Sequence, residues 1–265
     1  MAGERVDGAF EAQLAKSDRF GAILEHLADE GSVRVADIAQ RMGVSTATIR
    51  RDLEELEARH LLTRTHGGAV GRSVVYELPL RYKSATNVAE KRRIGAAAAA
   101  LVPDGAVIGL TGGTTTTEVA RALVERSSLT VVTNALNIGW ELAVHPRIKL
   151  VLTGGVARTQ SYELNGPLAE ESLARLNLDV VFLGVDGLDV DHGLTTHHEV
   201  EAHTDRVMIE RAPRVVVVAD RTKLGQVRFA QICPLDRVQQ LITDDAADQA
   251  AVGELRGAGL NVSLV

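Results

Sequence analysis

Residues 17–62 carry apolar side chains at helical spacing. Two predicted helix faces are Phe20, Ile23, Leu24 and Leu27, followed by Val35, Ile38, Ala39 and Met42. Gly31 and Gly43 directly follow these faces and are expected to end the two helices. A third helix is expected to begin after Ser45, which is a favourable N-cap residue, and to bury Ile49, Leu53 and Leu56. Weak alternation around Gly67 and Gly68 then predicts a short β-hairpin.

After residue 88 the pattern changes to short β-branched runs separated by helical segments. The predicted strands are 106–110, 130–133, 149–152, 180–185, 214–219, 240–243 and, more weakly, 261–264. This alternation is typical of βαβ units, and it predicts a Rossmann-like α/β domain with a mostly parallel sheet. The expected organisation is a flexible N-terminal extension (1–16), a helical module (17–72), a linker (73–87) and the α/β domain (88–265).

Three helices and a glycine hairpin describe a winged helix-turn-helix, which places its third helix, here 46–60, in the major groove of double-stranded DNA. Short hydroxyls reach phosphates or base edges, and arginine can grip guanine with two hydrogen bonds. The candidate DNA contacts at the helix start and on the wing are Ser45, Thr46, Thr48, Arg50, Arg51, Arg64 and His66.

A plainer interpretation of these arginines is open. Arg50 and Glu54, like Arg51 and Glu55, are four residues apart, so the arginines can serve only a solvated helix face. The net charge of −6 also argues against a nucleic-acid binder, whose domains usually have a basic patch. The arrangement of charge answers this objection, because residues 38–51 and 58–76 each hold three arginines and no acid.

Composition excludes several classes of protein. The one cysteine, Cys233, rules out an internal disulfide framework and a thiolate zinc cluster, and it fits a reducing cytoplasm. No apolar run reaches the roughly 18 residues of a membrane helix, and residues 1–16 have no apolar core of a secretion signal. Aromatic residues make up 3%, too few for a surface built on base stacking.

A glycine- and threonine-rich loop follows the predicted strand 106–110. Gly112, Gly113, Thr114, Thr115 and Thr116 combine close backbone approach, hydroxyls and the amides of a helix N-terminus, which suits an anion such as phosphate. The loop has neither the Walker A pattern nor the G-x-G-x-x-G dinucleotide pattern. An ordinary β–α turn with threonine capping is the alternative interpretation.

Other polar residues stand at the ends of predicted strands, where open α/β sheets bind ligands. They are Asn134, Gly154 and Gly155, Asp186 and Gly187, and Asp220 with Lys223. Any one of them alone is explained by turn chemistry. Together they favour a shared crevice, in which lysine supplies charge and aspartate binds hydroxyls, as a polyol phosphate requires.

Two stretches of the N-terminal module form a specific pattern: residues 34–56, above all Thr48-Ile-Arg-Arg-Asp-Leu53, and Leu61-Leu62 with His66-Gly-Gly-Ala69. On these residues the module resembles the DNA-binding domain of DeoR-type bacterial transcriptional regulators. The second half is similar to the sugar-phosphate sensor domain of the same family. Its matching segments are Glu90-Lys91, Gly113-Thr-Thr115, Val132-Thr-Asn134, Gly154-Gly155, Asn165-Gly-Pro167, Asp179, Phe182-Leu-Gly184, Asp186-Gly187, Gly193-Leu-Thr195, and Asp220 with Lys223.

This resemblance implies a fold similar to those of ribose-5-phosphate isomerase and glucosamine-6-phosphate deaminase. It also implies that a phosphorylated sugar alters DNA affinity, and it adds Glu201 as a candidate ligand contact. One departure concerns the glycine loop, because family members often have an Asp-Ser pair where this chain has Thr111 and Gly112. No cofactor is expected beyond this effector.

A group of histidines also needs an interpretation. His192, His197, His198 and His203 lie close together with several acids. A metal site is disfavoured, because His198 and His203 are five residues apart rather than the four of helical zinc pairs. Solvated histidines, or histidines that line the ligand crevice, are the preferred interpretation.

Three functions are compared. The favoured one is a cytoplasmic, DNA-binding regulator, a repressor of carbohydrate metabolism genes that acts as a dimer or tetramer and responds to a sugar phosphate. The alternative is a sugar-phosphate isomerase or deaminase with Asp186, Glu201 or Asp220 as base, but such an enzyme does not need the first 72 residues. A nucleotide-dependent regulator is disfavoured by the missing nucleotide motifs.

Overall fold

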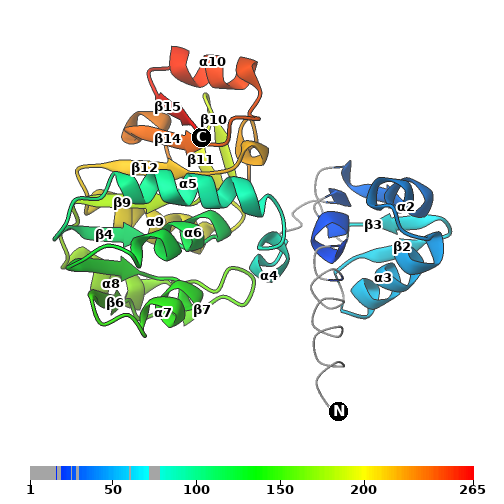
Figure 1. Cartoon of the computed structure of the whole chain (residues 1–265), viewed down its shortest axis with the longest axis horizontal. Coiled ribbons are helices and arrows are strands. Elements are labelled where there is room, and N and C mark those ends of the chain that lie inside the picture. The colour runs from blue at the N-terminus through cyan, green and yellow to red at the C-terminus, as the bar shows by residue number, and fades with distance from the viewer. Residues whose placement is uncertain (1–15, 17–18, 25, 28–29, 60, 72–77) are drawn as a thin grey trace. The chain divides into compact units, whose positions relative to one another are not determined.

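The computed structural model describes residues 16, 19–24, 26–27, 30–59, 61–71 and 78–265. The predicted extension 1–16 therefore lies almost wholly outside the described residues, as does the first part of the predicted linker, residues 73–77. The chain divides into two compact units, Met1–Thr86 and Asn87–Val265, which are drawn in Figure 1 and are taken here one at a time.

The N-terminal unit is a winged helix-turn-helix. Its elements are β1 (Ser32–Arg34), α2 (Val35–Met42), α3 (Thr46–Ala58), β2 (Thr63–Thr65), β3 (Gly68–Val70) and α4 (Leu80–Lys83), preceded by helical residues at 19–24 and 26–27. Strands β2 and β3 form the predicted hairpin, and β1 adds to it as a third antiparallel strand in the order β1-β3-β2. The predicted helices and wing are confirmed, and β1 was not predicted.

One apolar core holds this unit together. It contains the predicted inward faces, among them Phe20, Ile38, Ile49 and Leu53. Leu78 and Tyr82 also belong to it, although they come from the segment expected to be a linker. The Tyr82 ring lies 6.4 Å from that of Phe20, so residues 78–86 are structurally part of the first unit.

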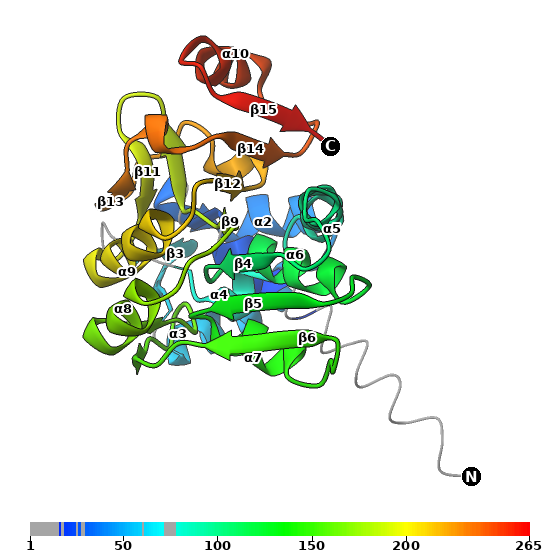
Figure 2. The same cartoon turned by 90° about the vertical axis from the view of Figure 1, so that its left-hand side faces the viewer.

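The C-terminal unit is built on a seven-stranded parallel sheet. Its strands are β4 (Val107–Leu110), β5 (Leu129–Thr133), β6 (Ile148–Leu152), β9 (Val180–Leu183), β12 (Val215–Val218), β14 (Gln240–Thr243) and β15 (Asn261–Leu264). They lie in the order β15-β14-β12-β9-β4-β5-β6, which can be followed from one edge of the sheet to the other in Figure 2. All seven predicted strands are present. The chain turns back between β4 and β9, so this is the topological switch point where doubly wound sheets bind ligands.

Two apolar clusters cover the two faces of the sheet. The first contains residues of α5 (Val88–Ala100), α6 (Thr114–Leu123) and α7 (Leu136–Leu142), and the second contains residues of α8 (Pro167–Ala174), α9 (Glu199–Glu210) and α10 (Gln249–Gly257). Along β9, Val180 and Phe182 join the first cluster, whereas Val181 and Leu183 join the second. The continuous apolar strands thus follow from burial on both sides.

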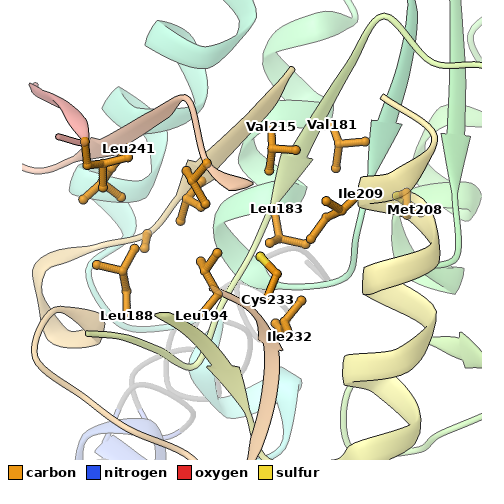
Figure 3. Close-up of a cluster of buried hydrophobic side chains, with 14 of the residues drawn as sticks. Val181, Leu183, Leu188, Leu194, Met208, Ile209, Val215, Ile232, Cys233 and Leu241 are labelled. Carbon is orange, nitrogen blue, oxygen red and sulfur yellow. The ribbon is translucent and has the colours of Figure 1, made fainter. Parts of the chain in front are cut away.

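The second cluster includes a small antiparallel sheet that the sequence did not predict. It is formed by β10 (Gly187–Asp189), β11 (Gly193–Thr196) and β13 (Ala230–Cys233), and Figure 3 shows Cys233 among the buried side chains. Burial raises the pKa of the Cys233 thiol to about 12, so it stays protonated. Two further strands of two residues each, β7 (Val156–Ala157) and β8 (Leu164–Asn165), pair antiparallel and were also not predicted. Short 3₁₀ turns span Arg221–Lys223 and Leu235–Arg237. Within the described part of the chain, no helix is long and apolar enough to cross a membrane.

Candidate functional site

The start of α3 is fixed by its cap. The Ser45 hydroxyl accepts a hydrogen bond from the Thr48 backbone N–H at 3.1 Å and lies 2.9 Å from the Thr48 hydroxyl. Ile49 and Leu53 are buried beneath this turn, so the opposite face, with Ser45 and Thr46, is exposed. Local capping and burial together orient the part of the helix that the sequence assigns to base contacts.

Arg50 and Arg51 are exposed on α3 and have no hydrogen bond or ion pair with another described residue. The acids that could have paired with them bind other cations. Glu54 accepts a hydrogen bond from Arg64 at 3.1 Å, and Glu55 pairs with both Lys16 and Arg59. The i,i+4 pairs Arg50–Glu54 and Arg51–Glu55 are therefore not formed, and both arginines lie on a solvated face of α3, where the plainer interpretation also stays open.

The residue next to Arg51 points inward. Asp52 is 2% exposed, and its two carboxylate oxygens accept hydrogen bonds from Arg19 at 2.8 and 3.1 Å. These hydrogen bonds raise the pKa of the Arg19 guanidinium. This ion pair, with its two hydrogen bonds, holds α3 against the first helix. It thereby determines which face of α3 is exposed to solvent.

The wing carries the other two candidates. Arg64 is half-buried and anchored to α3, because its backbone N–H donates to Glu57 at 2.9 Å and its guanidinium to Glu54. His66 is exposed at the turn. Gly68 follows, where a Cβ would lie 1.8 Å from the Val33 carbonyl oxygen, so only glycine lets β3 pair this closely with β1.

In the C-terminal unit the glycine loop lies at the switch point. The Thr111 N–H donates to the Phe182 carbonyl at 3.3 Å, and the Gly184 N–H donates to the Thr111 hydroxyl at 3.0 Å, so the loop after β4 is joined to the end of β9. Gly113, with φ of 128°, precedes α6. Amides 114–116 occupy the first turn of this helix and have no acceptor within it, which is the geometry of an anion site.

The threonines that follow are mostly buried. Thr115 and Thr116 are at most 7% exposed, and Thr114 is half-buried. The Thr116 hydroxyl donates to the Gly113 carbonyl at 3.0 Å, as that of Thr117 does at 2.6 Å. These hydroxyls cap and stiffen the turn, which leaves its backbone amides as the groups able to receive an anion.

Buried side-chain amides without a partner among the described residues lie at the ends of β5 and β8. Neither amide atom of Asn134, which follows β5, has a hydrogen-bond partner among the described residues, and the same holds for Asn165 on β8. The Thr153 hydroxyl, after β6, is a third such group. Leaving a buried polar group unsatisfied costs about 1–3 kcal/mol, so this set points to a polar ligand. Gly154 is exposed next to it, and a Cβ built on Gly155 would lie 2.9 Å from the backbone N and O of Asn165.

Three acidic residues, Asp186, Glu201 and Asp205, lie on the face of the sheet that α8, α9 and α10 cover. Glu201, 3% exposed on α9, accepts hydrogen bonds from Ser161 and, at 3.0 Å, from Arg158. Asp186 accepts from Thr196 at 3.2 Å, and Gly187 packs against the backbone of residue 226. Burial, and then the charges of Glu201 and Asp186, raise the pKa of Asp205 well above its usual value.

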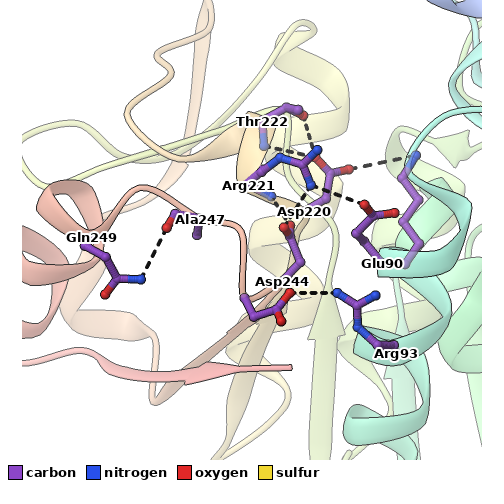
Figure 4. A network of polar contacts seen from close by, with 10 residues as sticks. Glu90, Arg93, Asp220, Arg221, Thr222, Asp244, Ala247 and Gln249 are labelled. Atoms are coloured by element: carbon purple, nitrogen blue, oxygen red, sulfur yellow. Dashed lines mark hydrogen bonds and ion pairs between the residues drawn. The ribbon is translucent and has the colours of Figure 1, made fainter.

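Asp220, Arg221, Thr222 and Asp244 form a polar network at the ends of β12 and β14 (Figure 4), and Lys223 ends the 3₁₀ turn Arg221–Lys223 beside it. Burial alone would raise the pKa of Asp220, but Lys223, Lys91 and two hydrogen bonds from Thr222 lower it below its usual value. The Lys91 ammonium lies 3.8 Å from Asp220, and both side chains are about 95% buried. Arg221 completes the network by donating to Asp244 at 2.9 Å.

The predicted ligand residues thus all lie at the carboxyl ends of parallel strands or on elements that begin there. Lys223 follows β12, two strands away from the glycine loop in the order β12-β9-β4. Sequence reasoning did not single out Glu163, whose carboxylate lies where a Cβ at Gly112 would be, nor Arg158 and Asp205. The first two come from the short β7–β8 region, which has no periodicity to reveal it, and Asp205 has the spacing of an ordinary helical residue.

The histidines are dispersed. His192 bonds to Asp189 at 2.8 Å and lowers the pKa of that carboxyl, and His203 lies 3.5 Å from Glu170. His198 caps α9 by accepting from the Val200 N–H. Among the residues that the structure describes, no group of three or more histidine, cysteine or acidic side chains is arranged to hold a metal ion.

Comparison with known proteins agrees with both units. The family model of the DeoR-like helix-turn-helix domain matches residues 19–73, and that of the DeoR C terminal sensor domain matches residues 86–245. The chain belongs to the DeoR family of transcriptional regulators.

Curated members of the DeoR family match over nearly the whole chain. A putative aga operon transcriptional repressor of Escherichia coli O157:H7 is 37% identical, with 94% of each chain covered. The HTH-type transcriptional regulator GlpR of Haloferax volcanii is 39% identical, covering 94% of this chain and 98% of its own. The glycerol-3-phosphate regulon repressor of E. coli K12 is 32% identical over 87% of this chain and 92% of its own.

Solved structures are more distant from this DeoR-family chain. The full-length sorbitol operon regulator SorC from Klebsiella pneumoniae has a TM-score of 0.41 at 14% identity, covering 89% of this chain and 97% of its own. Ribose 5-phosphate isomerase A from Methanocaldococcus jannaschii has a TM-score of 0.39 at 21% identity, covering 52% and 55%. These scores are too low to support an argument about ligands.

Proposed function

We propose that this DeoR-family chain represses carbohydrate metabolism genes and that a phosphorylated sugar releases it from its operator. One observation carries the proposal. The same chain joins a winged helix-turn-helix, whose third helix has arginines without a partner among the described residues, to an α/β unit with a glycine–threonine loop at its switch point. The names of the curated relatives, which include an aga operon repressor and a glycerol-3-phosphate regulon repressor, support the link to carbohydrate genes.

The proposed DNA contacts lie on α3 and the wing. Arg50 and Arg51 supply the base contacts, since their guanidinium groups are exposed and have no partner among the described residues. The remaining contacts, to phosphates or neighbouring base edges, are Ser45, Thr46, Thr48, Arg64 and His66. Helix-turn-helix proteins read paired half-sites, so the acting species is a dimer or tetramer. The proposed place of action is the cytoplasm.

The proposed ligand contacts surround the switch point. The amides of the Gly112–Thr116 loop receive the phosphate, because a helix N-terminus favours negative charge. Asn134, whose amide atoms have no partner among the described residues, contacts the sugar. The other proposed contacts are Gly154, Gly155, Asp186, Gly187, Glu201 and Lys223. The proposal includes no catalytic step and no cofactor.

A gel-shift titration tests this function. The full-length chain is mixed with DNA from immediately upstream of its gene, with and without ribose 5-phosphate, glucose 6-phosphate, fructose 6-phosphate or glycerol 3-phosphate, at one stated salt concentration. We expect a specific shift that one of these compounds weakens. No specific shift would contradict the DNA part, and a shift that none of the compounds alters would count against the ligand part.

A further inference from the structure

Glu163 brings a carboxylate to the glycine loop from a distant part of the chain. The residue is 6% exposed and directly precedes β8. A Cβ built on Gly112 would lie 2.0 Å from Glu163 Oε1 and 2.6 Å from its Cδ. The carboxylate therefore occupies the space that a side chain at position 112 would take.

The backbone holds Glu163 in this place. The Leu164 N–H donates to the Asn134 carbonyl at 2.8 Å, and the Glu163 carbonyl accepts from the Arg158 N–H at 2.8 Å. Ala135 and Glu163 form an isolated antiparallel bridge. These bonds tie the segment to the end of β5, the strand that Asn134 follows.

Gly112 is a glycine for reasons of space. Its φ lies outside the left-handed region that favours glycine, so its backbone conformation is open to other residues. Its neighbour Gly113, in contrast, has a φ of 128° and needs glycine for its conformation. The requirement at position 112 therefore comes from the Glu163 side chain.

We propose that Glu163 reads the hydroxyl groups of the phosphorylated sugar at the Gly112 loop, and that Gly112 is a glycine because it must admit this carboxylate. The inference rests on the proposed function and names the residue that selects the sugar. Neither Thr111 nor Gly112 has a carboxylate, so Glu163 supplies the loop with one from another segment.

The chemistry of the two ligand parts decides which of them faces Glu163. An ionised carboxylate only accepts hydrogen bonds, and a phosphate dianion likewise offers only acceptors, so the two groups repel. Sugar hydroxyls are donors and can bond to the carboxylate. The phosphate therefore takes the amides at the start of α6, and the hydroxyl-bearing carbons lie toward Glu163. Inorganic phosphate fills only the first of these places.

Calorimetry on the full-length chain tests the assignment. The probes are inorganic phosphate and the four sugar and polyol phosphates of the gel-shift panel. In Glu163→Gln, the affinity for the best-binding organic phosphate is expected to fall about tenfold or more, as for loss of a hydrogen bond to a charged group. The affinity for inorganic phosphate is expected to stay or rise, because a negative charge is removed.

The outcomes separate this inference from the proposed function. If no organic phosphate binds the wild-type chain, the ligand part of the proposed function is wrong and the inference falls with it. If the wild-type chain binds one and Glu163→Gln binds it equally well, only the role of Glu163 is wrong. Equal losses for organic and inorganic phosphate would also overturn that role, since they indicate a disturbed loop.

Further variants test whether position 112 must be a glycine to leave room for the Glu163 carboxylate. Gly112→Ala should push the carboxylate aside and reduce the preference for the organic phosphate as Glu163→Gln does. It should also lower the unfolding temperature in the wild-type background more than in Glu163→Ala, where the space is free. A wild-type ligand preference in Gly112→Ala, or equal thermal shifts in both backgrounds, would contradict the coupling. A cooperative thermal unfolding transition of the second unit confirms that each variant folds.

Discussion

At the scale of single residues, the arginines on and next to α3 fall into two groups: those that contact other side chains, and those without a partner among the described residues. Arg59 donates to Tyr82 at 3.1 Å and pairs with Glu55, and Arg64 pairs with Glu54. Arg50 and Arg51 have no such contact with another described residue. Replacing a side chain that has no partners changes the stability of the unit very little. The effect of such a substitution on DNA binding can therefore be measured apart from its effect on folding.

Arg50→Ala and Arg51→Ala are each expected to weaken operator binding by about 1–3 kcal/mol, the range of a bidentate base contact. Their unfolding temperatures should stay near wild type, because surface substitutions without partners change stability by only about 0.5 kcal/mol. Fluorescence anisotropy and thermal unfolding measure the two quantities. Arg147→Ala, which removes one exposed arginine from the other unit, is the matched control. Operator affinity lost equally in the control would show that only net charge matters.

The buried carboxyl of Asp205 gives a pH dependence whose sign is fixed. In the folded chain the pKa of Asp205 is raised, whereas an aspartate in the unfolded chain has a pKa of about 3.9. Above that pH the unfolded chain releases a proton that the folded chain keeps. Asp205 therefore lowers the free energy of unfolding by about 1.4 kcal/mol for each pH unit, until the folded pKa is passed.

Asp205→Asn should remove this pH dependence. Urea unfolding at several pH values is expected to show the wild-type chain losing stability relative to the variant as the pH rises from 4. The effect comes from burial and from the charges of Glu201 and Asp186, which the variant leaves in place. Parallel stability profiles for the two proteins would rule out a raised pKa.

At the scale of elements, the sequence predicts what is periodic and buried. The run from Val215 to Val218 is apolar throughout because both of its faces are covered, so it was recognised as a strand. Strands β1, β7 and β8 have two or three residues each, too few for a period to appear. The glycine–threonine loop could be located in the sequence because it directly follows β4, a recognisable strand. Glu163 was missed because it precedes β8, and only tertiary pairing brings it to the loop.

The wing shows how a short element depends on one contact. Strand β3 pairs with β1 through Gly68 and Arg34, and a methyl group at position 68 would collide with the Val33 carbonyl. Gly68→Ala should therefore destabilise the first unit by about 1–3 kcal/mol, the usual range for overpacking. Gly67→Ala is the control, because a Cβ there meets no atom within 4 Å. Thermal unfolding should separate the two variants, and equal behaviour would refute this account of the wing.

At the scale of the whole molecule, charge and ligand response depend on arrangement. Residues 1–72 carry 10 basic and 12 acidic side chains, and residues 73–265 carry 19 and 23, so neither part is basic overall. Non-specific DNA affinity comes from neutralised phosphates, and an acidic chain has little of it. Operator binding must then rely on a few placed arginines and on the oligomer, which makes it sensitive to any change in how two copies present their α3 helices.

Such a mechanism implies a measurable reciprocity. If a sugar phosphate lowers operator affinity by some factor, thermodynamic linkage requires that the operator lower the affinity for that sugar phosphate by the same factor. Anisotropy gives the first factor, from operator binding with and without saturating sugar phosphate. Calorimetry gives the second, from titration of the free chain and of the operator complex at the same salt concentration. Glu163→Gln should weaken sugar-phosphate binding in both forms while the two factors stay equal to each other. Unequal factors would mean that more than these two linked binding equilibria take part, such as a second sugar-phosphate molecule or a change of oligomer.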